Sequence, residues 1–188
     1  MKESLHYTKL HRSLHWIIAL SMIALFATGF MRMFWIERDF ISSVLGTELP
    51  DLELTKTQLR AITKNIREPM WKWHEIFAKV MFIAFTARVI YMFRKGIKFP
   101  NPLNNTLPVK ERFQGLTYVL FYVLVAVSIT TGICIEYHLL DQWHDAIEET
   151  HKLGAYWFPA FAILHFGGLA ISEISDKKRV IGKMIYGE

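Results

Sequence analysis

The chain has 188 residues, of which 52% are hydrophobic and 21% charged, and it carries a formal net charge of +5. The apolar residues gather in four runs of about 20, the length that crosses a bilayer, so we expect a single membrane domain over residues 1–188 and no separate soluble domain. The basic residues cluster at the ends of these runs, which argues against a nucleic-acid partner, and the single cysteine, Cys134, excludes a disulfide framework.

Four apolar segments are predicted to cross the membrane as helices, at about residues 13–35, 71–93, 113–135 and 149–171. Trp16 and Trp35 flank the first of them, where tryptophan side chains gather at membrane–water interfaces. Because a helix satisfies its backbone hydrogen bonds internally, we predict an all-α membrane protein, a bundle of four transmembrane helices.

A long polar segment, residues 36–70, connects the first two predicted spans. Within it, Thr55 and Gln58 have the spacing of a capping box, and apolar residues follow at helical intervals until Pro69. This pattern predicts a short amphipathic helix that ends at Pro69. It would lie on the membrane surface, on a partner, or against the outer end of the bundle.

The distribution of lysine and arginine predicts the orientation of the bundle. Residues 1–12, the 94–112 loop and the C-terminal tail are basic, and four spans place all three on one side of the membrane. The 136–148 loop, on the other side, has no lysine or arginine. Since basic loops stay in the cytoplasm, we predict that both termini are cytoplasmic.

Four histidines fall at two depths in this arrangement. His151 and His165 are fourteen residues apart in an almost wholly apolar stretch. If that stretch is one helix, its fourteen residues turn through about 1400°, nearly a whole number of turns, and separate the rings by about 21 Å. His165 then shares the inner depth with His15, and His151 shares the outer depth with His74.

Imidazoles that meet from two different helices, once at each depth, are what two bis-histidine haems require. We therefore predict that His15 and His165 ligate the iron of an inner haem, and that His74 and His151 ligate the iron of an outer haem. The chain has no Cys-x-x-Cys-His motif, so both groups are expected to be non-covalently bound haem b.

Other roles for these histidines fit the sequence less well. A single histidine in a span is more often a hydrogen-bonded bundle residue than a ligand. Zinc at either pair would leave the fourteen-residue spacing unexplained. A di-iron carboxylate centre is disfavoured because such bundles use two Glu-x-x-His motifs with two further glutamates, and here Glu148 and His151 have that spacing without a second inward set.

The same spacing selects two further residues, and a third lies beside His15. Gly29 follows His15 by fourteen residues and would leave room for a flat macrocycle at the outer level, although helix packing also uses glycine there. Arg88 follows His74 by fourteen and would pair with a haem propionate at the inner level, the alternative being that it snorkels to the cytoplasmic face. Arg12, one turn before His15, is a second candidate for a propionate.

Four sequence motifs carry a family resemblance. They are Arg12-Ser-Leu-His15-Trp16, His151-Lys-Leu-Gly154, the later His165, and the tail Gly182-Lys-Met-Ile-Tyr-Gly187. With them the chain resembles the bacterial di-haem membrane cytochromes b of the cytochrome b561 superfamily, including the membrane subunits of nickel-iron hydrogenases and formate dehydrogenases. The resemblance covers nearly the whole chain. It implies one haem ligand from each of the first two helices, two from the fourth, and an arginine near Arg88.

The resemblance also implies a function in the bacterial inner membrane. The chain is expected to be a respiratory electron-transfer subunit of an oxidoreductase complex, rather than a self-contained enzyme, and to link a periplasmic redox subunit or c-type cytochrome to the quinone pool. Quinone would react at the inner end near His11 and Arg12, and the partner would dock on the 36–70 and 136–148 loops. A homodimer is left open.

Two alternatives to this function stay open. One is a stand-alone superoxide:quinone oxidoreductase, because similar short cytochromes oxidise superoxide at the outer face. The other is a membrane anchor whose haems are mainly structural.

Overall fold

A computed structural model describes residues 7–49, 51, 54–176 and 180–187, and within these residues it contains helices and no strand. The model has four helical segments long and apolar enough to cross a membrane, at Lys9–Trp35, Lys56–Lys95, Val109–Glu136 and Asp141–Ile174. The prediction of an all-α, four-span membrane protein is confirmed.

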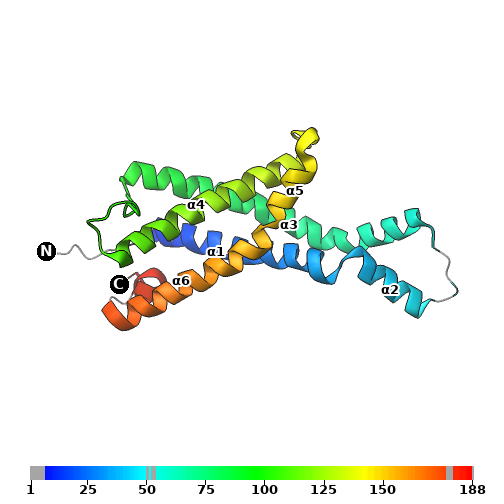
Figure 1. The fold of residues 1–188 in the computed structure, drawn as a ribbon, viewed down its shortest axis with the longest axis horizontal. Coiled ribbons are helices and arrows are strands. Elements are labelled where there is room, and N and C mark those ends of the chain that lie inside the picture. Colours follow the sequence, from blue (N-terminus) through cyan, green and yellow to red (C-terminus); the bar gives the residue numbers. More distant parts are fainter. Residues whose placement is uncertain (1–6, 50, 52–53, 177–179, 188) are drawn as a thin grey trace.

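In chain order the elements are α1 (Lys9–Phe30), the π-helical turn η1 (Met31–Trp35), α2 (Arg38–Glu48), α3 (Lys56–Lys95), α4 (Val109–Glu136), the 3₁₀ turn η2 (Asp141–Trp143), α5 (His144–Lys152), α6 (Gly154–Asp176) and α7 (Val180–Ile185). Helices α1, α3, α4 and α6 form an elongated bundle, as Figure 1 shows. The start of α1 and the short α7 lie at one end of it, and α2 lies beyond the other.

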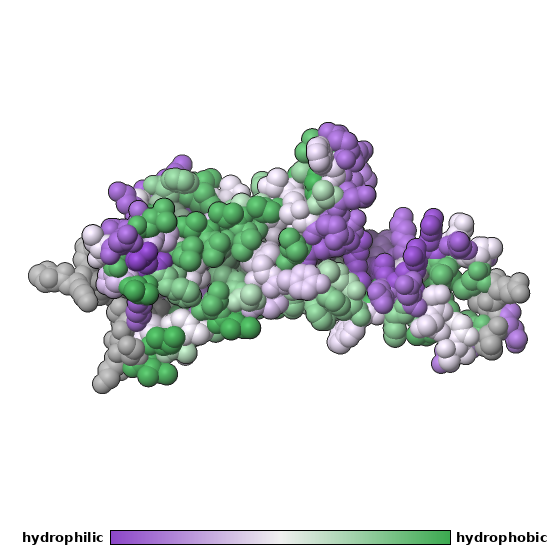
Figure 2. Space-filling view, in the orientation of Figure 1, coloured by the Kyte–Doolittle hydropathy of each residue, from purple (hydrophilic) through white to green (hydrophobic). Residues whose placement is uncertain are grey.

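The core is narrow and apolar. It is built around Leu14, Ile18 and Met22 from α1, Met81 from α3 and Val125 from α4. Large apolar side chains cover much of the outside of the bundle, visible as the green surface in Figure 2. In a bilayer this outward apolar surface faces lipid, so it needs no protein cover.

Helix α3 corrects one expectation from the sequence. The capping box at its start is present, because Thr55 Oγ1 accepts from the Gln58 amide at 3.3 Å and Gln58 Oε1 accepts from the Thr55 amide at 3.0 Å. The prediction that Pro69 ends this helix was wrong, since α3 continues through it to Lys95. A proline inside a helix removes one backbone hydrogen bond at a cost of about 3 kcal/mol.

Neighbouring elements contact α3 on the N-terminal side of Pro69. Helix α2 packs against α3, and Arg67 Nε donates to the carbonyl of Ile36, at the end of η1, at 2.5 Å. At about 1.5 Å per residue, the 40 residues of α3 are about twice as long as the hydrocarbon layer is thick. We call α2 together with residues 56–70 of α3 the stalk, because it projects beyond the bundle (Figure 1).

The stretch from His151 to His165 is the second correction. It was predicted as one helix, but α5 ends at Lys152 and α6 begins at Gly154. The Leu153 carbonyl accepts from the amides of both Tyr156 and Trp157 at 3.0 Å, so it starts the new helix. Figure 1 shows α5 turned away from the axis of α6. The two histidines therefore lie on different helices.

Candidate functional site

The four histidines form two pairs inside the bundle. The ring centroids of His15 (α1) and His165 (α6) lie 6.2 Å apart, with 43° between the ring planes. Those of His74 (α3) and His151 (α5) lie 6.3 Å apart, with 73° between the planes. All four side chains are partly buried. These are the pairs that the depth argument predicts, even though its assumption of one continuous helix was wrong.

The spacing within each pair suits one metal ion between two rings. A metal–imidazole nitrogen bond is about 2.0 Å, and the ring centre lies about 1.1 Å further on, which gives about 6 Å between opposed centroids. Among the described residues no group of three or more histidine, cysteine, aspartate or glutamate side chains could hold a metal ion. Two imidazoles opposed in this way are a ligand set that haem iron takes in proteins.

A cavity of about 1390 Å³ surrounds the outer pair and is lined by both of its histidines. Typical ligand sites measure about 300–1,000 Å³, so a large planar cofactor has room here. Two glycines from α1 and α4, Gly29 and Gly132, line the same cavity. A Cβ on Gly29 would lie 3.9 Å from His74 Cε1, and one on Gly132 only 3.1 Å from His151 Cε1.

Two threonine hydroxyls hold the outer rings. Thr28 Oγ1 lies 2.7 Å from His74 Nδ1, and Thr131 Oγ1 lies 3.0 Å from His151 Nδ1. Sequence reasoning selected Gly29 but missed both threonines and Gly132. The signal was available, because the same Thr-Gly dipeptide occurs at 28–29 and at 131–132.

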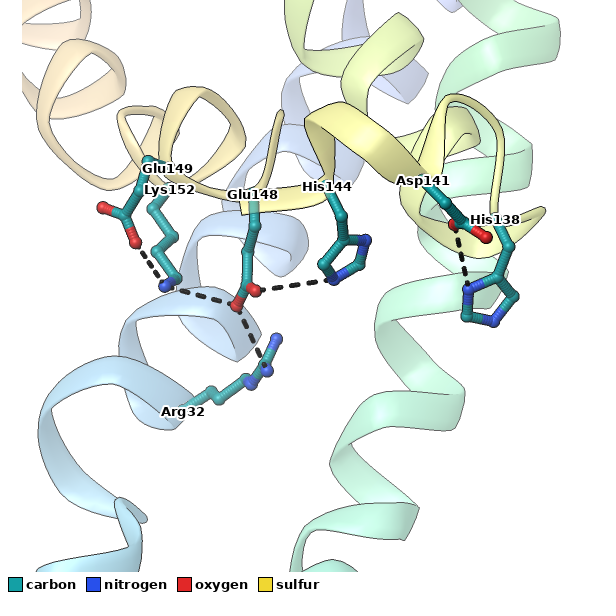
Figure 3. A network of polar contacts seen from close by, with 7 residues as sticks. All are labelled: Arg32, His138, Asp141, His144, Glu148, Glu149 and Lys152. Atoms are coloured by element: carbon teal, nitrogen blue, oxygen red, sulfur yellow. Dashed lines mark hydrogen bonds and ion pairs between the residues drawn. The ribbon is translucent and has the colours of Figure 1, made fainter. Parts of the chain in front are cut away.

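Charged and aromatic groups close the outer end of this site. Trp71 stacks on His74 with ring centroids 5.0 Å apart, and Arg32 lies 4.9 Å above the Trp71 ring. Figure 3 shows Arg32 facing Glu148 of α5 at 3.8 Å. His144 lies 3.8 Å from the same glutamate, so in this structure it contacts the ion-pair network rather than the histidine pair.

The inner end of the bundle holds Arg88. Its Nε donates to the Tyr122 hydroxyl of α4 at 2.8 Å, and one terminal nitrogen lies 3.4 Å from Nε2 of His11 on α1. The guanidinium is thus held between α1 and α4 beside His11, one turn before His15. Its remaining N–H groups are directed by this anchoring and can meet an anion.

Arg12 lies in surroundings that sequence reasoning did not foresee. One terminal nitrogen donates to the Ile185 carbonyl at 3.1 Å, and its Nε is buried without a hydrogen-bond partner in the described chain. The backbone of Gly187 lies so close that a Cβ there would meet the guanidinium at 2.6 Å. The C-terminal segment therefore packs on Arg12 at the inner end.

Comparison with known proteins identifies the family of the chain. A family model described as prokaryotic cytochrome b561 matches residues 6–187. The chain belongs to this family. No curated protein and no solved structure matches the chain. Membership makes it a membrane cytochrome that binds haem b and transfers electrons.

The residues present in this cytochrome fit haem b. The paired imidazoles are its usual axial ligands, the outer cavity has room for a macrocycle, and Arg88 and Arg12 offer cations for acidic substituents.

Proposed function

We propose that the chain is a di-haem cytochrome b that transfers electrons between a periplasmic redox partner and the quinone pool. His15 and His165 would hold the inner haem b, and His74 and His151 the outer one. The observation that carries the proposal is the repeated 6.2 and 6.3 Å spacing of the two imidazole pairs.

Haem b with two histidine ligands supplies one-electron redox chemistry and has no open coordination position for a substrate. The chain's part is to hold and shield the two sites. Phe161 stacks on His165 at 5.6 Å and Trp71 stacks on His74, so aromatic rings limit the freedom of one imidazole in each pair and exclude water beside it. Arg88 and Arg12 would pair with propionates at the inner end, and Gly29 would leave clearance at the outer one.

The inner end also offers polar groups for a quinone. Thr8 Oγ1 lies 2.8 Å from the Tyr91 hydroxyl, and the His11 ring stacks on Tyr7 at 5.0 Å. Quinone reduction consumes protons, so hydroxyl and imidazole groups near His15 suit that reaction. With both termini in the cytoplasm, this end would face the cytoplasm, and the stalk and residues 136–148 would receive the partner outside the bacterial inner membrane.

A second candidate is a stand-alone superoxide:quinone oxidoreductase. Arg60, Lys64 and Arg67 line the cavity of the outer histidine pair and follow each other along one face of α3. A basic lining attracts small anions to a redox site. Superoxide-driven reduction of the isolated chain would favour this candidate over a complex subunit.

The ligand assignment is tested by removing one histidine from each pair. His165→Ala and His74→Ala should each lower the haem content of the purified protein from two per chain to one, because each pair holds one iron. A pyridine haemochrome assay measures this ratio, and a redox titration shows which component is lost. His144→Ala, as the control, should keep both haems.

A His165→Ala or His74→Ala protein that keeps two haems would contradict the proposed pairs. Wild-type protein that is folded and inserted but binds one haem would contradict the di-haem proposal itself. A di-haem protein whose haems are not reduced by quinol would favour the membrane anchor.

A further inference from the structure

The two outer histidines are held by matching hydrogen bonds. The Thr28 hydroxyl lies 2.8 Å from the Ala24 carbonyl and 3.0 Å from that of Leu25, as well as 2.7 Å from His74 Nδ1. On α4, the Thr131 hydroxyl lies 2.8 Å from the Val127 carbonyl and 3.1 Å from that of Ser128, as well as 3.0 Å from His151 Nδ1.

These contacts determine the tautomer of each ring. A hydroxyl has one proton, and a backbone carbonyl can only accept, so each threonine gives its proton to its own helix. Its oxygen must then accept from the imidazole, which places the imidazole proton on Nδ1. The lone pair of Nε2 is left free for a metal.

We propose that Thr28 and Thr131 are positioning residues that set the outer haem at a lower reduction potential than the inner haem. The inference rests on the ligand assignment of the proposed function. A hydrogen bond from Nδ1–H to an acceptor makes the imidazole a stronger electron donor, and a stronger donor stabilises ferric iron. Two such bonds act on the outer site.

The inner site is built differently. Among the described residues, the ring nitrogens of His15 and His165 have no hydrogen-bond partner, and their ring contacts are with aromatic side chains such as Trp16 and Phe161. Arg88, which would pair with a propionate at this end, bonds Tyr122 and His11 rather than the rings of this pair.

Charge at the outer level does not cancel this difference. Arg32 is the cation next to the outer pair, through Trp71, and it faces the carboxylate of Glu148 at 3.8 Å. The outer cavity is also lined by both cations and carboxylates, including Arg60, Lys64, Arg67, Glu37, Glu68 and Glu75. At the inner level, the charge of Arg88 would be offset in turn by the propionate proposed for it. The hydrogen bonds of the outer imidazoles, rather than charge, therefore distinguish the two sites and favour an inward gradient, with electrons more stable at the inner end.

The test replaces the hydroxyls without changing the shape of the side chains. Thr28→Val, Thr131→Val and the double variant are compared with Thr130→Val, a matched control on the same helix whose side chain is exposed. The readouts are haem content, the midpoint potentials of both haems, and the low-temperature electron paramagnetic resonance of the ferric protein. The component missing in His74→Ala identifies the outer haem.

Each single variant should keep its haem and raise the ratio of reduced to oxidised outer haem at a fixed ambient potential. Thr28→Val should raise this ratio by about fivefold, the effect of one ordinary hydrogen bond. Thr131→Val should raise it by less, because the Ser128 backbone also bonds the His151 ring. The double variant should show both shifts, and the midpoint potential of the inner haem should stay unchanged. The ferric signal of the outer haem should also change, because its ring planes are no longer held.

Potentials in Thr28→Val and Thr131→Val equal to those of Thr130→Val would overturn the inference, as would a wild-type outer haem with the higher potential. Either result leaves the ligand assignment standing if His74→Ala still removes one haem. If His74→Ala removes no haem, the ligand assignment itself is wrong, whatever the threonine variants show.

Discussion

A single added methyl group meets different surroundings at the two glycines of the outer site. At Gly132 a Cβ would lie 3.1 Å from His151 Cε1, closer than side chains usually approach, whereas at Gly29 the nearest ring atom is 3.9 Å away. His151 is also tied to Thr131, so its ring has little freedom to move aside. The residue with the stricter demand for glycine is therefore Gly132.

We predict that Gly132→Ala displaces the His151 ring and lowers haem content from two per chain toward one, with the loss confined to the outer component. Gly29→Ala should retain more of that haem, and Gly167→Ala, with nothing within 4 Å of its Cβ, should behave as wild type. Haem content and the outer midpoint potential measure the effect. Equal retention by Gly29→Ala and Gly132→Ala would contradict this ranking.

At the scale of elements, the stalk is stabilised locally as well as by packing. The capping box of Thr55 and Gln58 satisfies backbone groups at the start of α3. Further along, Arg67 ties α3 to the end of η1. Helix α3 is longer than the hydrocarbon layer is thick, so its first part extends beyond the lipid. There these polar contacts, rather than the apolar surroundings of the bilayer, stabilise the helix.

Thr55→Ala should loosen the first turn of the stalk, since the loss of an N-cap costs about 1 kcal/mol. Amide hydrogen exchange at residues 56–59 should become about fivefold faster, with haem content unchanged. Thr57→Ala, an exposed threonine in the same turn, is the control. Loss of haem in Thr55→Ala would show instead that the stalk supports the outer site.

The break at Leu153 is the other element that shapes the site. It lets α5 bring His151 toward His74, while α6 carries His165 toward His15. The Arg32–Glu148 contact joins α5 to the end of the first span, and the bonds of Glu148 and Glu149 with Lys152 lie within α5 itself (Figure 3). A straight helix would tie the two rings to one axis, whereas two helices can be placed independently.

The whole molecule has an apolar middle and polar ends. Figure 2 shows hydrophobic side chains along the bundle and hydrophilic ones around α5 and the stalk. Together with the basic 94–112 loop at the opposite end, this pattern predicts that the stalk is periplasmic and the loop cytoplasmic.

Cysteine labelling in intact cells tests that orientation. On a Cys134→Ser background, a membrane-impermeant maleimide should label Ser43→Cys in the stalk and leave Thr106→Cys in the 94–112 loop unlabelled until the cells are permeabilised. Both positions lie in polar segments outside the apolar spans. The reverse pattern would place the termini in the periplasm and exchange the inner and outer haems.

The sequence by itself determined the class of the protein, its four apolar spans and the capping box at Thr55, and it predicted which histidines pair. These features depend on the length of apolar runs, on local spacing and on which side of the membrane each run begins, all of which can be read along one dimension. The motifs around His15 and His151 also led to the correct family.

Only the tertiary structure decided how the helices are rotated and where they break. It continued α3 through Pro69, divided α5 from α6 at Leu153, and brought Thr28 to His74 and Thr131 to His151. Thr28 and His74 are 46 residues apart, so no local pattern records their contact. Such contacts depend on how neighbouring helices pack, because packing decides which face of each helix meets the other.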